Sequence, residues 1–123
     1  MEEQELKERF RQYSIRIVRM VDSIPTKRIA AVAIAKQVIR SGTSPAANYR
    51  AACVAKSKRD FLNKLKMVEE ELDETRYWLE LMVDTDIFPK EKLDALIQET
   101  IELLNIIVKS IVSTRYYLSQ HPE

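Results

Sequence analysis

The sequence is poor in the residues that form tight turns and in those that cross-link chains. It contains one glycine, four prolines and one cysteine among 123 residues. Because tight hairpins depend on glycine and related turn residues, strands joined by hairpins are not expected. The single cysteine, Cys53, excludes a disulfide within the chain and is typical of a reducing compartment. These shortages favour an all-α protein.

Long uncharged apolar runs are also missing. The most apolar stretch, residues 101–112, is interrupted by Glu102, Asn105 and Lys109, so it is too polar to cross a bilayer. The first ten residues, MEEQELKERF, are charged and mainly acidic, whereas a signal peptide begins with basic residues and continues with apolar ones. We therefore expect a cytoplasmic bacterial protein that makes no contact with a membrane.

Few residues are suited to metal or nucleophilic chemistry. The only histidine, His121, lies close to the end of the sequence, and the Glu-x-x-His motif of di-iron bundles is absent. Ser41, Thr43, Ser44 and Cys53 have no neighbouring histidine to act as a base. A chain with one glycine also lacks a glycine-rich phosphate loop. We therefore expect no metal, no cofactor and no catalytic residue, and hence a protein that is not an enzyme.

What the sequence does contain is apolar residues at alternating steps of four and three, the spacing of one helix face. This pattern predicts helices over residues 3–23, 57–84 and 90–118, and an alanine-rich segment predicts another over residues 26–54. The first stripe consists of Leu6, Phe10, Tyr13, Ile17, Met20 and Ile24. The third helix carries Phe61, Leu65, Val68, Leu72, Thr75, Leu79 and Met82. Short connections between such helices predict a single domain over residues 1–123, an antiparallel up-down-up-down four-helix bundle.

The least regular stretch is RSGTSPAANYRAA, residues 40–52, which contains Gly42 and Pro45. Either residue could end the second helix, or Pro45 could stand in the first turn of a continuation. Alanines resume immediately after Pro45, so we prefer a kinked but continuous helix. A few residues later, Ser57 followed by Asp60 is the signature of a capping box, which predicts the start of the third helix.

The last predicted helix is apolar on more than one side. Its apolar positions include Leu93, Leu96, Ile97, Ile101, Leu104, Ile107, Val108, Ile111, Val112 and Leu118. Two further residues, Leu103 and Ile106, fall outside the main stripe. A helix that is apolar on two faces is buried on two faces, so in a bundle this small the pattern predicts oligomerisation.

Charge is unevenly distributed along the chain. Residues 1–66 hold 15 Lys/Arg and 6 Asp/Glu, a net charge of +9, whereas residues 67–123 hold 5 and 13, a net charge of −8. Attraction between neighbouring helices explains such a division, and so does a basic surface for nucleic acid or pairing between subunits. Clustered positive charge is sufficient for contact with phosphates. The candidate nucleic-acid-binding residues are Arg50, Lys56, Lys58, Arg59, Lys64 and Lys66.

Asn48, Glu71 and Arg76 form another set of polar residues on the predicted helices. Polar groups between helices need partners, and one such set can fix the register of a bundle. We interpret these three residues as a structural polar network rather than as a functional pocket.

Two motifs, RSGTSPAANYRAA at residues 40–52 and FLNKLKMVEEELDETRYWLEL at residues 61–81, resemble those of a known family. The family comprises the bacterial four-helix-bundle proteins encoded in 23S rRNA intervening sequences. The matching residues are Arg40, Ser41, Gly42, Thr43, Ser44, Asn48, Phe61, Lys64, Leu65, Glu71, Glu74, Thr75, Arg76, Tyr77, Trp78 and Leu79. Pro45 departs from the aliphatic residue of the family pattern, and residues 50–52 lack the acidic residue often found there.

The resemblance implies a ring-like homopentamer of four-helix bundles with no established biochemical activity. A related branch is the accessory protein of diversity-generating retroelements, which binds a reverse transcriptase and nucleic acid through a basic surface. Two hypotheses follow for this chain. The first is a non-enzymatic homo-oligomer that binds RNA or DNA, structured RNA in particular, through its basic surface. The alternative is a protein-interaction scaffold, such as a reverse-transcriptase accessory protein.

Overall fold

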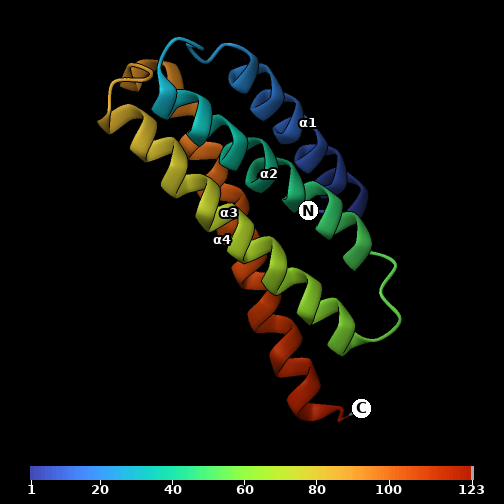
Figure 1. Ribbon diagram of the computed structural model, residues 1–123. Helices are drawn as coiled ribbons and strands as arrows, with labels where there is room; N and C mark the ends of the chain where they lie inside the picture. The colour runs from blue at the N-terminus through green and yellow to red at the C-terminus, as the bar shows by residue number, and fades with distance from the viewer. Residues whose placement is uncertain (123) are drawn as a thin grey trace.

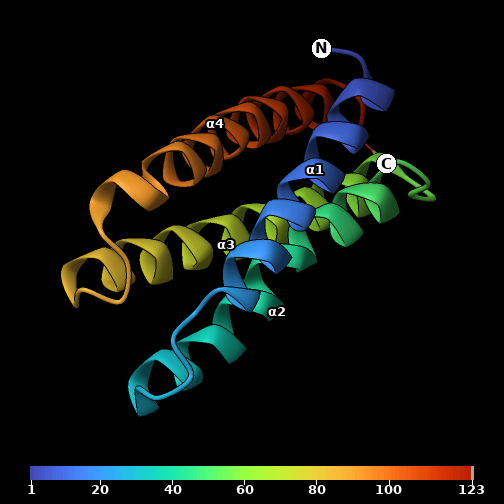
Figure 2. The same ribbon diagram turned by 90° about the horizontal axis from the view of Figure 1, so that it is seen from above.

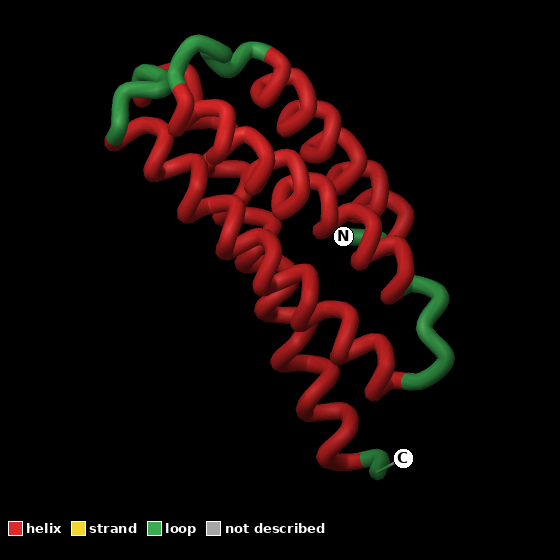
Figure 3. Tube along the Cα trace, in the orientation of Figure 1, coloured by secondary structure: helices red, strands yellow, loops and turns green. Residues whose placement is uncertain are grey.

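The computed structural model describes residues 1–122, which form four α-helices (Figure 1). Helix α1 spans Glu3–Asp22, α2 spans Ile29–Ala52, α3 spans Lys58–Asp84 and α4 spans Lys90–Gln120. No strand occurs within these residues (Figure 3). The predicted all-α class is therefore confirmed. Within residues 1–122, no helix combines the length and the apolar character needed to cross a membrane.

The connections show which helix ends lie together. The α1–α2 and α3–α4 connections lie at one end of the molecule, and the α2–α3 connection lies at the other (Figure 1). Helix α2 packs against α1 and α3, and α3 packs against α4, whereas the contact between α1 and α4 is limited (Figure 2). The last turns of α4 extend beyond the other helices (Figure 1). The start of α3 therefore lies near the ends of both α2 and α4.

Helix boundaries fall close to the predicted ones, with the largest difference at the start of α2. This helix begins at Ile29 rather than at residue 26, because Thr26 and Lys27 form a turn. The side chain of Arg28 then donates hydrogen bonds of 3.0 Å to the carbonyl oxygens of Thr85 and Asp86, which ties the start of α2 to the α3–α4 connection. Further along, α2 continues without interruption through residues 42–45 to Ala52, as the preferred prediction stated.

The start of α3 has the predicted cap. Ser57, in extended conformation, accepts a hydrogen bond of 3.0 Å on its Oγ from the backbone N–H of Asp60. Such a bond satisfies one of the backbone donors that a helix leaves unpaired in its first turn. The prediction made from these two residues is confirmed.

The core of α1 agrees with its predicted stripe, since all six residues are buried. On α3, the six positions from Leu65 to Met82 in the predicted stripe are also buried. Leu62 occupies the next core position toward the start of this helix, whereas Phe61 is only partly buried beside the core. The prediction was therefore wrong at Phe61, because that ring lies next to Lys58 at the edge of the bundle.

The core face of α4 differs more from the prediction. Its buried residues are Leu93, Leu96, Thr100, Leu103, Ile107, Ile111, Thr114 and Leu118. Leu103, predicted to lie off the stripe, is fully buried, whereas Val108 and Val112 are 37% and 60% exposed. The hydroxyls of Thr100 and Thr114 donate to backbone carbonyls one turn earlier, at 2.8 Å and 2.7 Å. Two polar residues at core positions thus hid the true face of this helix.

Gly42 on α2 lies against Ile17 of α1. The glycine is buried, and a Cβ placed on it would lie 2.7 Å from Cγ2 of Ile17. Carbon atoms do not pack at that separation. The missing side chain therefore allows the close contact between these two helices.

Candidate nucleic-acid interface

The six predicted nucleic-acid-binding residues gather around the α2–α3 connection, and we call this region the basic end. Arg50 lies in the last turn of α2 and Lys56 in the connection, while the remaining four lie in the first turns of α3. Lys64 is partly buried, and the other five residues are exposed. The α2–α3 connection lies at one end of the molecule (Figure 1), so the positive residues of this connection and of the adjoining helix turns gather at that end.

Lys64 has an acidic partner on its own helix. Its Nζ lies 3.1 Å from Oδ1 of Asp60, and Oδ2 of Asp60 accepts a hydrogen bond of 3.4 Å from the backbone N–H of Lys56. The hydrogen bond from Lys64 lowers the pKa of Asp60, so this carboxylate is charged and offsets one positive charge of the basic end.

The basic end belongs to a longer segment that contains no acidic residue. Between residues 23 and 59 there are no Asp or Glu, and the basic residues are Lys27, Arg28, Lys36, Arg40, Arg50, Lys56, Lys58 and Arg59. Two of these eight serve the fold: Arg28 holds the α3–α4 connection, and Arg40 pairs with Glu74 at 2.9 Å and with Glu71 at 3.5 Å. The other six lie outside these two structural contacts.

Two clefts border the basic end. One, of about 560 Å³, runs between α1 and α2 and is lined by Lys7, Arg11 and Arg50, with Glu8 as its acidic member. The other, of about 460 Å³, lies beside the α2–α3 connection and includes Glu3, Lys56, Lys58 and Phe61. Positive charge on the walls of a concave surface favours anionic ligands.

Cys53 lies in the second cleft without the features of a reactive thiol. Burial raises the pKa of this thiol to about 11, and the hydrogen bond that the thiol donates to the carboxylate of its neighbour Glu3 acts in the same direction. The thiolate is the nucleophilic form of cysteine, so a thiol that stays protonated at neutral pH is a poor nucleophile. A group of three or more His, Cys, Asp or Glu placed to hold a metal ion is not found in residues 1–122.

Aromatic rings from α4 reach the basic end, which the sequence alone did not predict. Nζ of Lys58 lies 5.5 Å from the ring centroid of Phe61 and 5.3 Å from that of Tyr117. The ring of His121 stacks on Tyr117 with 4.2 Å between centroids and 15° between planes. Lys58 and Tyr117 are far apart in the sequence, and only the register of α3 against α4 brings them together.

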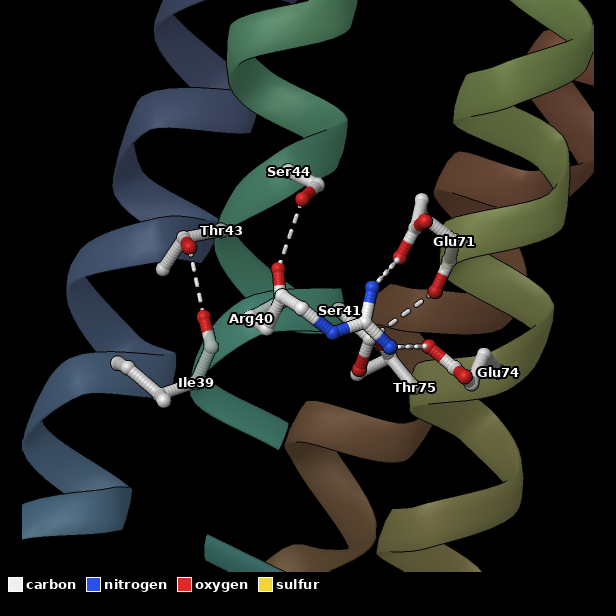
Figure 4. Close-up of polar contacts among 8 residues, drawn as sticks. All are labelled: Ile39, Arg40, Ser41, Thr43, Ser44, Glu71, Glu74 and Thr75. Carbon is white, nitrogen blue, oxygen red and sulfur yellow. Dashed lines mark hydrogen bonds and ion pairs between the residues drawn. The ribbon is translucent and has the colours of Figure 1, made fainter. Parts of the chain in front are cut away.

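A polar cluster joins α2 and α3 away from the basic end (Figure 4). Ser41 and Thr75 are both fully buried, and their hydroxyl oxygens are 2.9 Å apart. Oγ1 of Thr75 also lies 2.8 Å from the carbonyl oxygen of Glu71. The Thr75 hydroxyl is the donor in both contacts, so it shares its single proton between Oγ of Ser41 and the carbonyl oxygen of Glu71. Nearby, Arg40 on α2 forms ion pairs with both Glu71 and Glu74 on α3.

Two opposing effects act on the pKa of Glu71. Its partial burial raises its pKa, while the positive charge of Arg40 lowers it. The burial effect is the larger, so the net shift is upward. A carboxylate in this position relies on Arg40 to remain charged between the helices.

The predicted network of Asn48, Glu71 and Arg76 is not the one that the structure forms. Glu71 pairs with Arg40, while Nε of Arg76 lies 3.5 Å from Oε2 of Glu80. Within residues 1–122, no hydrogen bond or ion pair joins the three predicted residues to one another. The helix register separates Asn48 from Arg76: Ser41 is level with Thr75, the neighbour of Arg76, and Asn48 lies seven residues, or about 10 Å, further along α2.

Comparisons with known proteins agree on the relatives of this chain. Residues 2–109 match the model of a family described as 23S rRNA-intervening sequence protein. The chain is also similar to the crystal structure, at 1.70 Å, of a protein with unknown function from the S23 ribosomal protein family of Bacteroides thetaiotaomicron VPI-5482. The TM-score is 0.83 at 32% sequence identity, and the match covers 90% of this chain and 98% of that chain. No curated protein matches.

Proposed function

The chain belongs to the 23S rRNA-intervening sequence protein family, and from this premise we propose that it is a non-enzymatic homo-oligomer that binds structured RNA through its basic end. Family membership confirms the resemblance found in the two sequence motifs. The related crystal structure is of a protein with unknown function, so the support for this proposal is the basic end of this chain.

The observation that carries the proposal is the acid-free segment between residues 23 and 59. Its basic residues include the exposed side chains Arg50, Lys56, Lys58 and Arg59, which are displayed together around one helix connection. Nucleic-acid affinity comes largely from cations that contact phosphates and release counterions. An exposed basic end bordered by two clefts provides such cations without needing any catalytic group.

The same chain has a surface suited to contact with further copies of itself. On α4, Ile97, Ile101 and Leu104 are partly buried, while Val108 and Val112 are more exposed. We call these five residues the outer flank of α4. Apolar residues at helical spacing on an exposed flank favour association. The proposed assembly is a ring-like homopentamer of antiparallel up-down-up-down bundles, and the positions of the helix connections support that topology (Figure 1).

Charge reversal at the basic end tests the proposed function. A fluorescently labelled, folded RNA hairpin is titrated with the protein at low salt, and its anisotropy gives the affinity. In the double variant Lys58→Glu, Arg59→Glu, we expect affinity to fall roughly a hundredfold, because two favourable phosphate contacts become repulsive.

The matched control makes the same charge change at the opposite end of the molecule. Lys90→Glu with Lys92→Glu alters the start of α4, which lies far from the α2–α3 connection, and should leave affinity within about threefold of the unmodified protein (Figure 1). Equal losses in both double variants would point to net charge alone, and equal retention in both would contradict the proposal. A protein that assembles but ignores RNA would instead fit the scaffold hypothesis.

A further inference from the structure

A continuous surface of rings and positive charge lies where the start of α3 meets the end of α4. It consists of Phe61, Lys58, Tyr117 and His121, and we call it the ring surface. The ammonium group of Lys58 lies over both the Phe61 ring and the Tyr117 ring, and the His121 ring stacks on Tyr117. Tyr117 is 42% exposed, so its ring is accessible to a ligand.

The contact between Tyr117 and His121 has the geometry that a nucleobase takes on an aromatic side chain. The two rings are nearly parallel, at 15°, and their centroids are 4.2 Å apart. His121 is exposed, and within residues 1–122 its ring nitrogen contacts a single protein atom, the carbonyl oxygen of Tyr117, at 3.1 Å. A base can therefore extend this stack on the imidazole or replace the imidazole on Tyr117.

Positive charge lies close to the ring surface. Lys58 is part of it, and the exposed residues Lys56 and Arg59 lie within two residues of Lys58. Single-stranded nucleic acid is bound where cations track the backbone while aromatic rings stack on the bases. In a duplex the base faces are covered by their neighbours, so rings of this kind recognise unpaired nucleotides.

The ring surface is separate from the flank of α4 proposed for subunit contact. Tyr117 follows Val112 by five residues, which places the two side chains roughly 140° apart around the helix axis. The outer flank and Tyr117 therefore lie on different sides of α4, and the ring surface is not part of the proposed flank.

We infer that the ring surface binds unpaired nucleotides, with bases stacked on Tyr117 and His121 and phosphates held by Lys58 and Arg59. This inference rests on the proposed function and names the part of the RNA that is recognised, namely loops and single strands rather than the paired stem.

Abasic RNA tests the inference without altering the protein. Three labelled ligands are compared by anisotropy at one salt concentration: an A-rich single strand, the same strand with abasic sites in its centre, and a duplex of equal length. The abasic strand keeps every phosphate and loses only its stacking rings. We expect it to bind about tenfold more weakly than the intact strand, and the intact strand to bind more tightly than the duplex.

Variants of Tyr117 assign the effect to this surface. Tyr117→Leu should reduce the affinity for the intact strand by about tenfold and leave the abasic strand unaffected, whereas Tyr117→Phe retains the ring and should retain binding. Tyr77→Leu is the matched control, since Tyr77 is 57% exposed on α3 away from the basic end. A 2-aminopurine base in the strand should be quenched by the unmodified protein and not by Tyr117→Leu.

Each outcome separates this inference from the proposed function. Equal affinity for intact and abasic strands, with salt-dependent binding of both, would overturn stacking and leave RNA binding by the basic end in place. Tighter binding of the duplex than of the single strand would do the same. Salt-dependent binding of none of the three ligands would overturn the proposed function and this inference together.

Discussion

At the scale of single residues, the fold depends on small and polar side chains that a hydrophobic pattern does not reveal. Gly42 is buried because Ile17 fills the space where its side chain would be. Ser41 and Thr75 satisfy each other in a fully buried position. The sequence identified Gly42 as a point of irregularity, yet its partner on α1 depends on the register of two helices, which no single sequence position encodes.

Replacing Gly42 by alanine should destabilise the protein. Three atoms of Ile17 lie between 2.7 Å and 3.0 Å from the position of the added Cβ, and Ile17 is fully buried. Overpacking of this kind costs about 1–3 kcal/mol, while the better helix propensity of alanine returns about 1 kcal/mol. We therefore expect a net loss of up to about 2 kcal/mol in the free energy of unfolding, measured by urea denaturation.

A second background separates the two effects. In an Ile17→Ala protein the crowding atoms are absent, so Gly42→Ala should be neutral or stabilising there. The same destabilisation in both backgrounds would show that contact with Ile17 is not the cause.

The thiol of Cys53 should react slowly in the folded protein. Its pKa is raised from 9.0 to about 11, chiefly by burial. Stability from this protonated thiol is complete below pH 9 and is lost as pH rises through 11, because only the unfolded chain releases the proton readily in that window. Alkylation by iodoacetamide at pH 8, followed by mass spectrometry, should be several-fold slower than in urea. Equal rates would contradict a raised pKa.

At the scale of helices, the existence and order of all four elements could be predicted from apolar spacing, alanine content and the positions of the prolines. The core face of α4 could not, because Thr100 and Thr114 are buried and satisfy their hydroxyls within the helix. The start of α2 was placed too early, because Pro25 precedes a turn rather than the helix itself. Both errors arise where a polar or turn residue has a role that depends on its surroundings.

The cap of α3 should make a measurable contribution to stability. Ser57→Ala removes the acceptor for the backbone N–H of Asp60 and should lower the free energy of unfolding by about 1 kcal/mol. Ser57→Asn supplies another capping oxygen and should restore most of the loss. If the alanine and asparagine variants have the same unfolding midpoint, the side-chain cap is not what stabilises this end of the helix.

At the scale of the whole molecule, the chain presents an apolar flank on α4 and a basic end around the α2–α3 connection. The sequence predicted the six basic residues as a group, and the structure places them at one end. The sequence could not predict that Tyr117 and His121 lie beside Lys58, because this contact joins the start of α3 to the end of α4. Contacts between distant segments follow from helix length and register, which composition and spacing do not fix.

Association through the outer flank of α4 should be broken by a charge placed within it. For a homopentamer we expect a mass in solution of five times 14.4 kDa, about 72 kDa, measured by light scattering after gel filtration. Val112→Glu buries a carboxylate in the proposed contact and should shift the mass toward that of one chain. Ile29→Glu, at a position 91% exposed near the start of α2, is the control. An unmodified protein with the mass of one chain would contradict the assembly.

The central claim is that the basic end holds RNA by contact with phosphates, and the salt dependence of affinity tests it most directly. A labelled RNA hairpin is titrated at several salt concentrations between 50 and 200 mM. With about five exposed cations engaged, affinity should fall roughly a hundredfold or more over this range, and the logarithmic slope should become shallower in Lys58→Glu, Arg59→Glu. An affinity that does not change with salt, or the absence of any binding at 50 mM, would contradict the account.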